Sequence, residues 1–181
     1  AMEELATTAF YSLDRSVHIT AEATSHCKTN TFATGVCFAE VEVDMPLGKV
    51  KVTNIVNVHD SGNLINPKLA AAQVHGGMSM GIGYGMSERL IFDKKTGRAL
   101  NNNLLDYKLS TFMDHPRLKA VFAENTEPTS AFGTKALGEP PACSVAPAIR
   151  NAVYQATGVG VNDAPVNPHN LFRRFTEEGL I

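Results

Sequence analysis

Two runs of alternating apolar and polar residues in the first third of the chain predict a pair of β-strands. From residue 36 to 43, and again from 50 to 58, apolar side chains recur at about every second position, which is the period of a strand that buries one face. Between the runs, Asp44-Met45-Pro46-Leu47-Gly48 carries proline and glycine, residues typical of a tight turn. The two strands are therefore expected to form an antiparallel hairpin.

An asparagine followed by a proline occurs at two places and predicts the start of a helix at each. At Asn66-Pro67 and at Asn167-Pro168, the asparagine side chain can accept a hydrogen bond from a free N–H group of the first helical turn, and the proline already has a helical φ. The first helix is expected to run from Pro67 to about Arg89, and the second to include Phe175.

The rest of the chain is predicted to mix short strands, loops and one further helix. We expect strands at 88–92 and 117–124, a turn at 93–97 and a loop rich in small residues at 126–138. A helix within 140–157 should kink at Pro147 or become regular after it, and Gly158 should end it. This irregular alternation predicts a single α+β domain over residues 1–181, with a two-layer arrangement of an antiparallel or mixed sheet and packed helices.

Composition and charge narrow the class of protein. The chain has 181 residues, of which 44% are hydrophobic, enough for a buried core; its net charge of −2 gives no field that would attract nucleic acid or an anionic membrane. The longest apolar runs fall short of the roughly 18–20 residues that span a bilayer. The three cysteines are odd in number and lack the spacing of a zinc site. We therefore expect a cytoplasmic protein without a disulfide framework.

The helix expected after Pro67 contains an unusual density of glycine. Five of the fourteen glycines of the chain fall within ten residues, namely Gly76, Gly77, Gly81, Gly83 and Gly85. Each glycine in a helix interior costs about 1 kcal/mol relative to alanine, so the cluster needs a reason. Three of these glycines lie four residues apart, on the helix face that also carries Gln73. This face is suited either to close packing of another helix or to close approach of a flat ligand beside the Gln73 amide.

Glu139 is the candidate general base. It precedes Pro140-Pro141 and is therefore expected at the N-terminus of a helix, where the helix dipole favours a charged carboxylate. The same position is also typical of a residue that only caps a helix. A further alternative pairs Glu139 with Cys143 in a hydrolase. His59 and Asp60 are not expected to act as an acid–base pair, because adjacent strand residues point to opposite faces.

Three segments in this order resemble the molybdenum-binding subunit of the xanthine dehydrogenase family. They are Asp60-x-Gly-x-x-x-Asn66-Pro67, Gln73-Val-His-Gly-Gly77 and Thr134-Lys-Ala-Leu-Gly-Glu139-Pro-Pro141, and Pro165-Val-Asn-Pro168 resembles the end of that subunit. The resemblance runs from about Ala33 to the C-terminus. Because subunits of that family are several times longer, the resemblance implies that this chain is a C-terminal fragment with a molybdenum-cofactor-binding fold of the xanthine dehydrogenase type.

The resemblance also implies a role for four residues. Glu139 would be the active-site base, and Gln73, Gly76 and Gly77 would line the molybdenum–molybdopterin cofactor. No side chain would ligate the metal, because the dithiolene of the pterin does so. The partners implied are the remainder of the molybdenum subunit and the iron–sulfur and FAD subunits. The implied reaction is the oxidative hydroxylation of purines such as hypoxanthine and xanthine, and the isolated fragment is expected to bind no cofactor stably and to be inactive.

Two alternatives to a purine hydroxylase remain open from the sequence. A sister molybdenum hydroxylase would act on aldehydes or other N-heterocycles. A non-catalytic interaction or assembly module would use the glycine-rich helix only to pack on a partner. The positions of two side chains distinguish catalysis from assembly, because an active site requires Gln73 and Glu139 to lie together, whereas an assembly module lets them lie apart.

Overall fold

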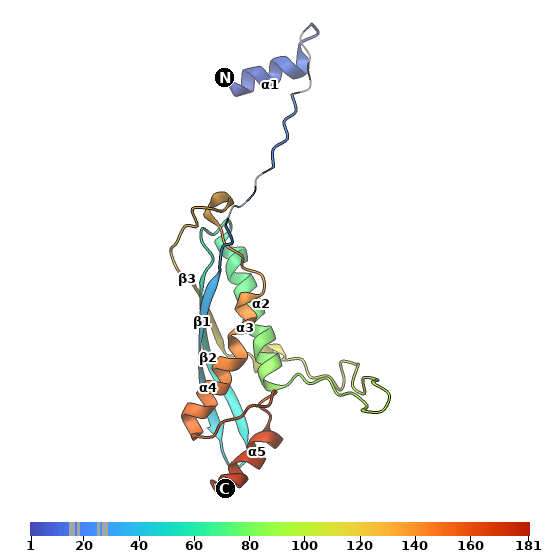
Figure 1. Cartoon of the computed structure of the whole chain (residues 1–181), viewed down its shortest axis with the longest axis vertical. Coiled ribbons are helices and arrows are strands. Elements are labelled where there is room, and N and C mark those ends of the chain that lie inside the picture. Colours follow the sequence, from blue (N-terminus) through green and yellow to red (C-terminus); the bar gives the residue numbers. More distant parts are fainter. Residues whose placement is uncertain (15–16, 18, 25, 27–28) are drawn as a thin grey trace.

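The centre of the fold is a three-stranded sheet covered by helices, as the computed structural model shows for the described residues 1–14, 17, 19–24, 26 and 29–181 (Figure 1). The strands are β1 Thr34–Asp44, β2 Lys49–Asp60 and β3 Arg117–Phe122. The α-helices are α1 Met2–Tyr11, α2 Pro67–Met86, α3 Pro140–Cys143, α4 Val145–Thr157 and α5 Pro168–Glu177, and short 3₁₀ turns span Phe112–Asp114 and Ala131–Gly133.

The central strand β2 pairs differently with its two neighbours. β1 runs antiparallel to it along the whole hairpin, from Thr34 opposite Asp60 to Asp44 opposite Lys49. β3 lies on the other side of β2 and runs parallel to it, with α2 in the crossover between the two strands. The predicted hairpin and the predicted strand at 117–124 are therefore confirmed, and the sheet is mixed.

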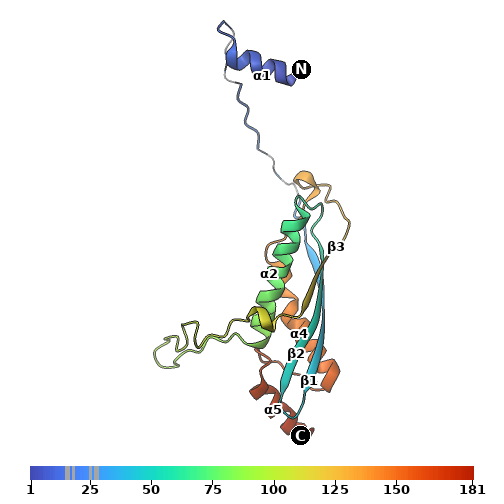
Figure 2. The same ribbon diagram turned by 180° about the vertical axis from the view of Figure 1, so that it is seen from behind.

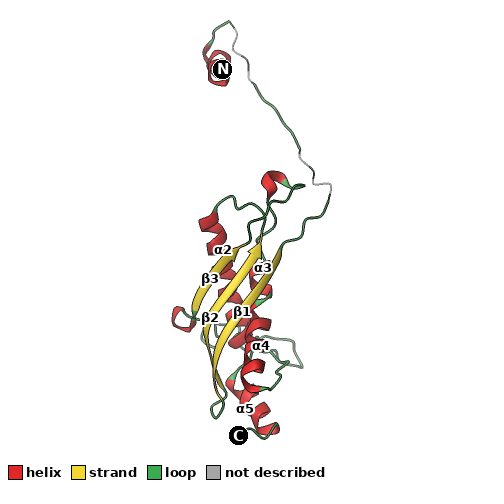
Figure 3. Cartoon of the chain, turned by 90° about the vertical axis from the view of Figure 1, so that its left-hand side faces the viewer, coloured by secondary structure: helices red, strands yellow, loops and turns green. Residues whose placement is uncertain are grey.

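Helices α2, α3 and α4 pack together on one face of this sheet, which gives the two layers of the predicted α+β fold (Figures 1 and 3). One core cluster lies between the layers and consists of Val52, Ile55, Val74, Met78, Ile82, Val145 and Ile149. A second cluster joins the end of α4 to α5 and consists of Val153, Val159, Val161, Val166, Leu171 and Phe175. Helix α1 lies apart from this body and buries none of its residues (Figure 2).

Both helices predicted from an asparagine–proline pair are confirmed with their caps. The Asn66 side chain accepts a hydrogen bond from the backbone N–H of Leu69 at 3.1 Å, at the start of α2. The Asn167 side chain accepts one from the backbone N–H of Asn170 at 2.9 Å, at the start of α5. Helix α2 ends at Met86, three residues before the expected end.

The strand predicted at 88–92 is wrong. These residues begin a long loop that projects from the body between α2 and the 3₁₀ turn at Phe112–Asp114 (Figure 2). Their β-like pairing is a single isolated bridge between Phe92 and Ala99 around the predicted turn at 93–97. The apolar residues 90–92 are exposed, so no neighbouring strand or core completes a sheet there.

The helix predicted within 140–157 is divided into α3 and α4 at Ser144. The break lies three residues before Pro147, the position at which a kink was expected. Pro147 falls in the first turn of α4, where its missing N–H removes no helical hydrogen bond. Gly158 ends α4 with a φ of 74°, as predicted. Within the described ranges, no helix combines the length and the hydrophobicity needed to cross a membrane.

Candidate functional site

The glycine face of α2 packs directly on α3 and α4. A Cβ added at Gly77 would lie 2.5 Å from the Cβ of Pro141, and one added at Gly81 would lie 2.5 Å from the Cβ of Val145. Gly85 faces α4 one turn further along. These contacts leave no room for a side chain, so close helix packing, one of the two explanations offered for this face, is confirmed.

Gly76 and Gln73 lie on an exposed part of the same helix. Outside its own helix, no atom lies within 4 Å of the place where a Cβ of Gly76 would stand, so the backbone of α2 is accessible at this point. The Gln73 side chain, three residues earlier, is also exposed, and its Nε2 donates a hydrogen bond of 2.7 Å to the carbonyl oxygen of Gly138. This contact joins α2 to the residue directly before Glu139, although the two partners are 65 positions apart in the sequence.

Glu139 stands immediately before α3, and its side chain is exposed. Its carboxylate makes no capping hydrogen bond to this helix, so the hypothesis that Glu139 serves only as a cap is wrong. Because α3 is a single turn of four residues, its dipole is also too small to be the main influence on the carboxylate. The carboxylate is therefore available to a ligand, beside the segment that Gln73 contacts.

Asp60 anchors the loop that leads to Glu139. Its carboxylate accepts hydrogen bonds from Nζ of Lys135 at 2.7 Å, from Nδ2 of Asn125 at 2.8 Å and from the backbone N–H of Gly62 at 3.1 Å. The hydrogen bond from Lys135, followed by those from Asn125 and Gly62, lowers the pKa of Asp60 to about 2. The loop at 125–135 is thereby tied to the end of β2.

No role was predicted for Asp60, although the sequence contained a signal for it. An aspartate two residues before a glycine is typical of a turn in which the carboxylate binds the following backbone, and Gly62 has the positive φ, 63°, that favours glycine. A Cβ at Gly62 would collide with the carbonyl oxygen of Gly133 in the same loop. The Asp60-x-Gly segment thus holds the loop at 125–135 in two ways: the Asp60 carboxylate binds Asn125 and Lys135, and Gly62 lets the backbone of Gly133 pack closely.

The histidine and cysteine candidates do not form a catalytic pair with Glu139 or Asp60. The His59 side chain is buried, and burial lowers its pKa. The thiol of Cys143 donates to the backbone carbonyl of Glu139 at 3.5 Å rather than to its carboxylate, which gives no support to a hydrolase built on these two residues. Burial raises the pKa of Cys37 to about 11, and Cys27 lies outside the described residues.

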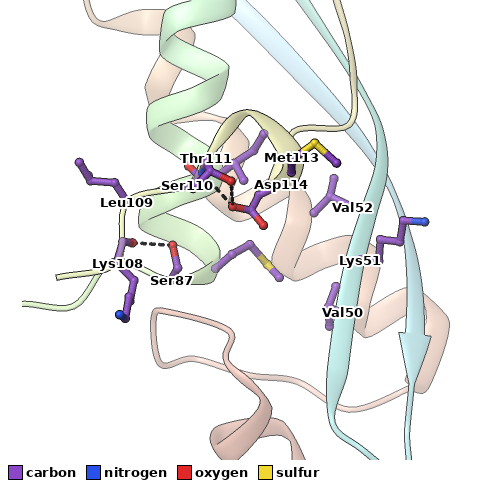
Figure 4. A pocket seen from close by; sticks show the side chains of 12 residues that line it. Val50, Lys51, Val52, Ser87, Lys108, Leu109, Ser110, Thr111, Met113 and Asp114 are labelled. Atoms are coloured by element: carbon purple, nitrogen blue, oxygen red, sulfur yellow. Dashed lines mark hydrogen bonds between the residues drawn. The ribbon is translucent and has the colours of Figure 1, made fainter. Parts of the chain in front are cut away.

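Two further features bear on where a ligand could bind. Across the residues that the structure describes, no group of three or more histidine, cysteine, aspartate or glutamate side chains could hold a metal ion. A cavity of about 480 Å³ lies between β2, the C-terminal half of α2 and residues 108–114 (Figure 4). Its lining reaches α2 at Ile82 and Met86. The nearer of these, Ile82, lies nine residues or about 14 Å along the helix from Gln73, and neither Gln73 nor Glu139 is among the lining residues.

A comparison with protein families matches the N-terminal two thirds of the chain. Residues 1–116 match the family model described as "Molybdopterin cofactor-binding domain". The matched segment contains the β1–β2 hairpin and α2, and with them Gln73, Gly76 and Gly77. Glu139 follows the matched segment.

Individual proteins similar to this chain are subunits of molybdenum enzymes or belong to such enzymes. The "Xanthine dehydrogenase molybdenum-binding subunit" of Escherichia coli O157:H7 is 49% identical over 181 residues, which are 100% of this chain and 24% of that protein. The "Aldehyde oxidoreductase molybdenum-binding subunit PaoC" of Escherichia coli (strain K12) is 36% identical over 141 residues, 77% of this chain and 19% of that protein.

A solved structure has the same fold. The "Reconstituted CO dehydrogenase from Oligotropha carboxidovorans" superposes with a TM-score of 0.76 at 26% identity, and the match covers 83% of this chain and 19% of that one. The chain thus spans about a quarter or less of the length of the proteins that it matches.

Proposed function

This chain belongs to the molybdopterin cofactor-binding family of molybdenum hydroxylases, and we propose that within a longer subunit it supplies the active-site base and part of the cofactor pocket. In this proposal Glu139 is the base and Gln73 and Gly76 line the cofactor. Gly77, which is buried against Pro141, contributes by letting α3 pack close to this part of α2. The observation that carries the proposal is the hydrogen bond of 2.7 Å from Gln73 to Gly138. It joins the family-matched helix α2 to the segment that carries Glu139, which supports a shared site for the two residues.

The residues of α2 suit a large, flat cofactor. Gly76 leaves the helix backbone open, because no side chain or neighbouring segment lies within 4 Å of its missing Cβ. A glutamine amide has two N–H donors and a carbonyl acceptor, so Gln73 keeps polar atoms for a ligand after one donor is given to Gly138. The molybdenum cofactor, when bound, supplies the redox chemistry.

Glu139 performs the proton transfer in this proposal. As an exposed carboxylate beside the cofactor region, it would take a proton from a hydroxyl group that is about to attack an electron-poor carbon of the substrate. Its backbone is held at Gly138 by Gln73, and the preceding loop is held by Asp60. These contacts hold the backbone from which the carboxylate projects, which favours the fixed geometry that a general base requires.

For the whole enzyme we propose the oxidative hydroxylation of a purine such as hypoxanthine or xanthine, with electrons leaving through iron–sulfur clusters and FAD on partner subunits. The 49% identity to a xanthine dehydrogenase subunit over the whole chain favours this substrate class. The 36% identity to an aldehyde oxidoreductase subunit favours an aldehyde as the second candidate. Measuring kcat/KM for xanthine and for an aromatic aldehyde with the full-length enzyme decides between them.

The base is tested by Glu139→Gln in the full-length, cofactor-loaded enzyme. Since general bases contribute about 10²–10⁴-fold to rate, we expect kcat to fall by about that factor while the molybdenum content stays unchanged. Glu42→Gln, at an exposed position on β1, is the matched control and should retain kcat. A loss of only a few-fold in Glu139→Gln would contradict the assignment and favour a non-catalytic assembly module.

A further inference from the structure

A buried asparagine on the central strand contacts the segment that carries Glu139 from the side opposite to solvent. The side chain of Asn57 is fully buried, and its Nδ2 donates a hydrogen bond of 2.9 Å to the carbonyl oxygen of Pro141. The two residues are 84 positions apart in the sequence. Asn57 belongs to β2, which is paired on both sides, by β1 and by β3, so the donor stands on the most firmly held strand of the sheet.

The Pro141 carbonyl needs such a donor. The last carbonyls of a helix have no partner within the helix, and α3 consists of only four residues before the break at Ser144. Pro141 is itself buried, so its carbonyl cannot rely on solvent for a hydrogen bond. An unpaired polar group at a buried position is strongly unfavourable, and Asn57 removes this penalty for one arrangement of α3 against the sheet.

The segment 138–141 is thus held at both of its ends. Gln73 of α2 binds the carbonyl of Gly138, and Asn57 of β2 binds the carbonyl of Pro141. Gly77 closes a third side, because a Cβ there would lie 2.5 Å from the Cβ of Pro141. Glu139 lies between the two bound carbonyls, and the next residue, Pro140, restricts the backbone further through its fixed φ.

We propose that Asn57 is a positioning residue for Glu139: its buried amide sets the place of α3 on the sheet and thereby the place of the carboxylate. This inference rests on the proposed role of Glu139 as the base. Asn57 touches neither substrate nor cofactor in this scheme, and its effect on catalysis passes through the backbone at Pro141.

The test uses Asn57→Leu in the full-length, cofactor-loaded enzyme, since leucine has a similar volume and no donor. A misplacement of a catalytic group by about 1 Å lowers rates by about 100-fold, so we expect kcat to fall by about 10–100-fold with unchanged molybdenum content. Amide hydrogen exchange at residues 142–143 should become faster. Asn57→Ala, which lacks the donor and introduces no bulkier or charged group, serves the same purpose if the leucine variant does not fold.

Asn170→Leu is the matched control, because Asn170 is also buried and its Nδ2 donates to a proline carbonyl, that of Pro165, at 3.3 Å. That contact lies at the start of α5, next in sequence to Val166 and Leu171 of the second core cluster. The control should lower the melting temperature as Asn57→Leu does, yet leave kcat within about two-fold, which is far from the loss that misplacement produces. Equal kcat values for the two variants would overturn the proposal.

A double variant separates positioning from general destabilisation. If Asn57 acts through Glu139, adding Asn57→Leu to Glu139→Gln should lower kcat no further, because effects of residues that act as a unit are not additive. A further fall of ten-fold or more would overturn the positioning role. If Glu139→Gln alone keeps full activity, the base assignment is overturned as well. If Glu139→Gln is inactive but Asn57→Leu keeps the wild-type kcat, only the inference about Asn57 is overturned.

Discussion

The packing of α2 on α3 makes a quantitative prediction for Gly77→Ala. The new Cβ would lie 2.5 Å from the Cβ of Pro141, 2.9 Å from its carbonyl carbon and 3.0 Å from the backbone nitrogen of Ala142. None of these atoms belongs to a flexible side chain, so the backbone of α3 has to move. Overpacking of this kind costs about 1–3 kcal/mol, and contact with backbone places Gly77→Ala in the upper half of that range. Replacing a helical glycine by alanine stabilises the helix by about 1 kcal/mol. The net effect of Gly77→Ala is therefore a loss of about 1–2 kcal/mol in the free energy of unfolding.

The adjacent residue provides the control for this prediction. At Gly76 a Cβ would meet nothing within 4 Å outside its own helix, so Gly76→Ala should keep the gain in helix propensity and stabilise the chain by about 0.5–1 kcal/mol. Urea denaturation of both variants and the wild type measures these changes in the free energy of unfolding. If the two substitutions change stability by the same amount in the same direction, the close contact between α2 and α3 is not present in solution.

Two further predictions concern the anchors of the site. The folded-state pKa of Asp60, about 2, lies below the ordinary 3.8, so its hydrogen bonds stabilise the chain above pH 3.8 and this contribution is lost as the pH falls from 3.8 towards 2. The thermal midpoints of the wild type and Asp60→Asn should therefore differ at about pH 6 and converge near pH 2. A difference in midpoint that stays constant over this pH range would contradict the assignment. Asn66→Ala removes the cap of α2 and should lower the free energy of unfolding by about 1 kcal/mol, whereas a change within about 0.2 kcal/mol in urea denaturation would show that the cap is not formed.

Local chemistry explains which elements could be predicted from the sequence. The hairpin followed from alternating apolar residues, and the starts of α2 and α5 followed from Asn66-Pro67 and Asn167-Pro168, because in each case neighbouring residues determine the backbone. The strand expected at 88–92 failed because a short apolar run becomes a strand only beside a partner strand, and here the run projects from the body. The break at Ser144 was not predicted, and the hydrogen bond from Asn57 of β2 to Pro141 just before it joins residues 84 positions apart, which neighbouring residues do not show.

The candidate site was predictable only in part for the same reason. Glu139 and Gln73 stood out through motifs, but the hydrogen bond that brings their segments together spans 65 positions and depends on the folded chain. Asn57 could have been found from the alternation itself, since it occupies the same strand face as Ile55, and both are fully buried. A polar residue on a buried face requires a partner, although only the structure shows that this partner is Pro141.

A crystal structure of the full-length subunit with cofactor and a slow substrate would show directly whether Glu139 and Gln73 face the molybdenum cofactor together. We expect the Glu139 carboxylate within hydrogen-bond reach, about 2.6–3.2 Å, of the oxygen that is to lose a proton, with the Gln73 amide against the cofactor. A cofactor bound away from both side chains would refute the assignment of these residues to the active site.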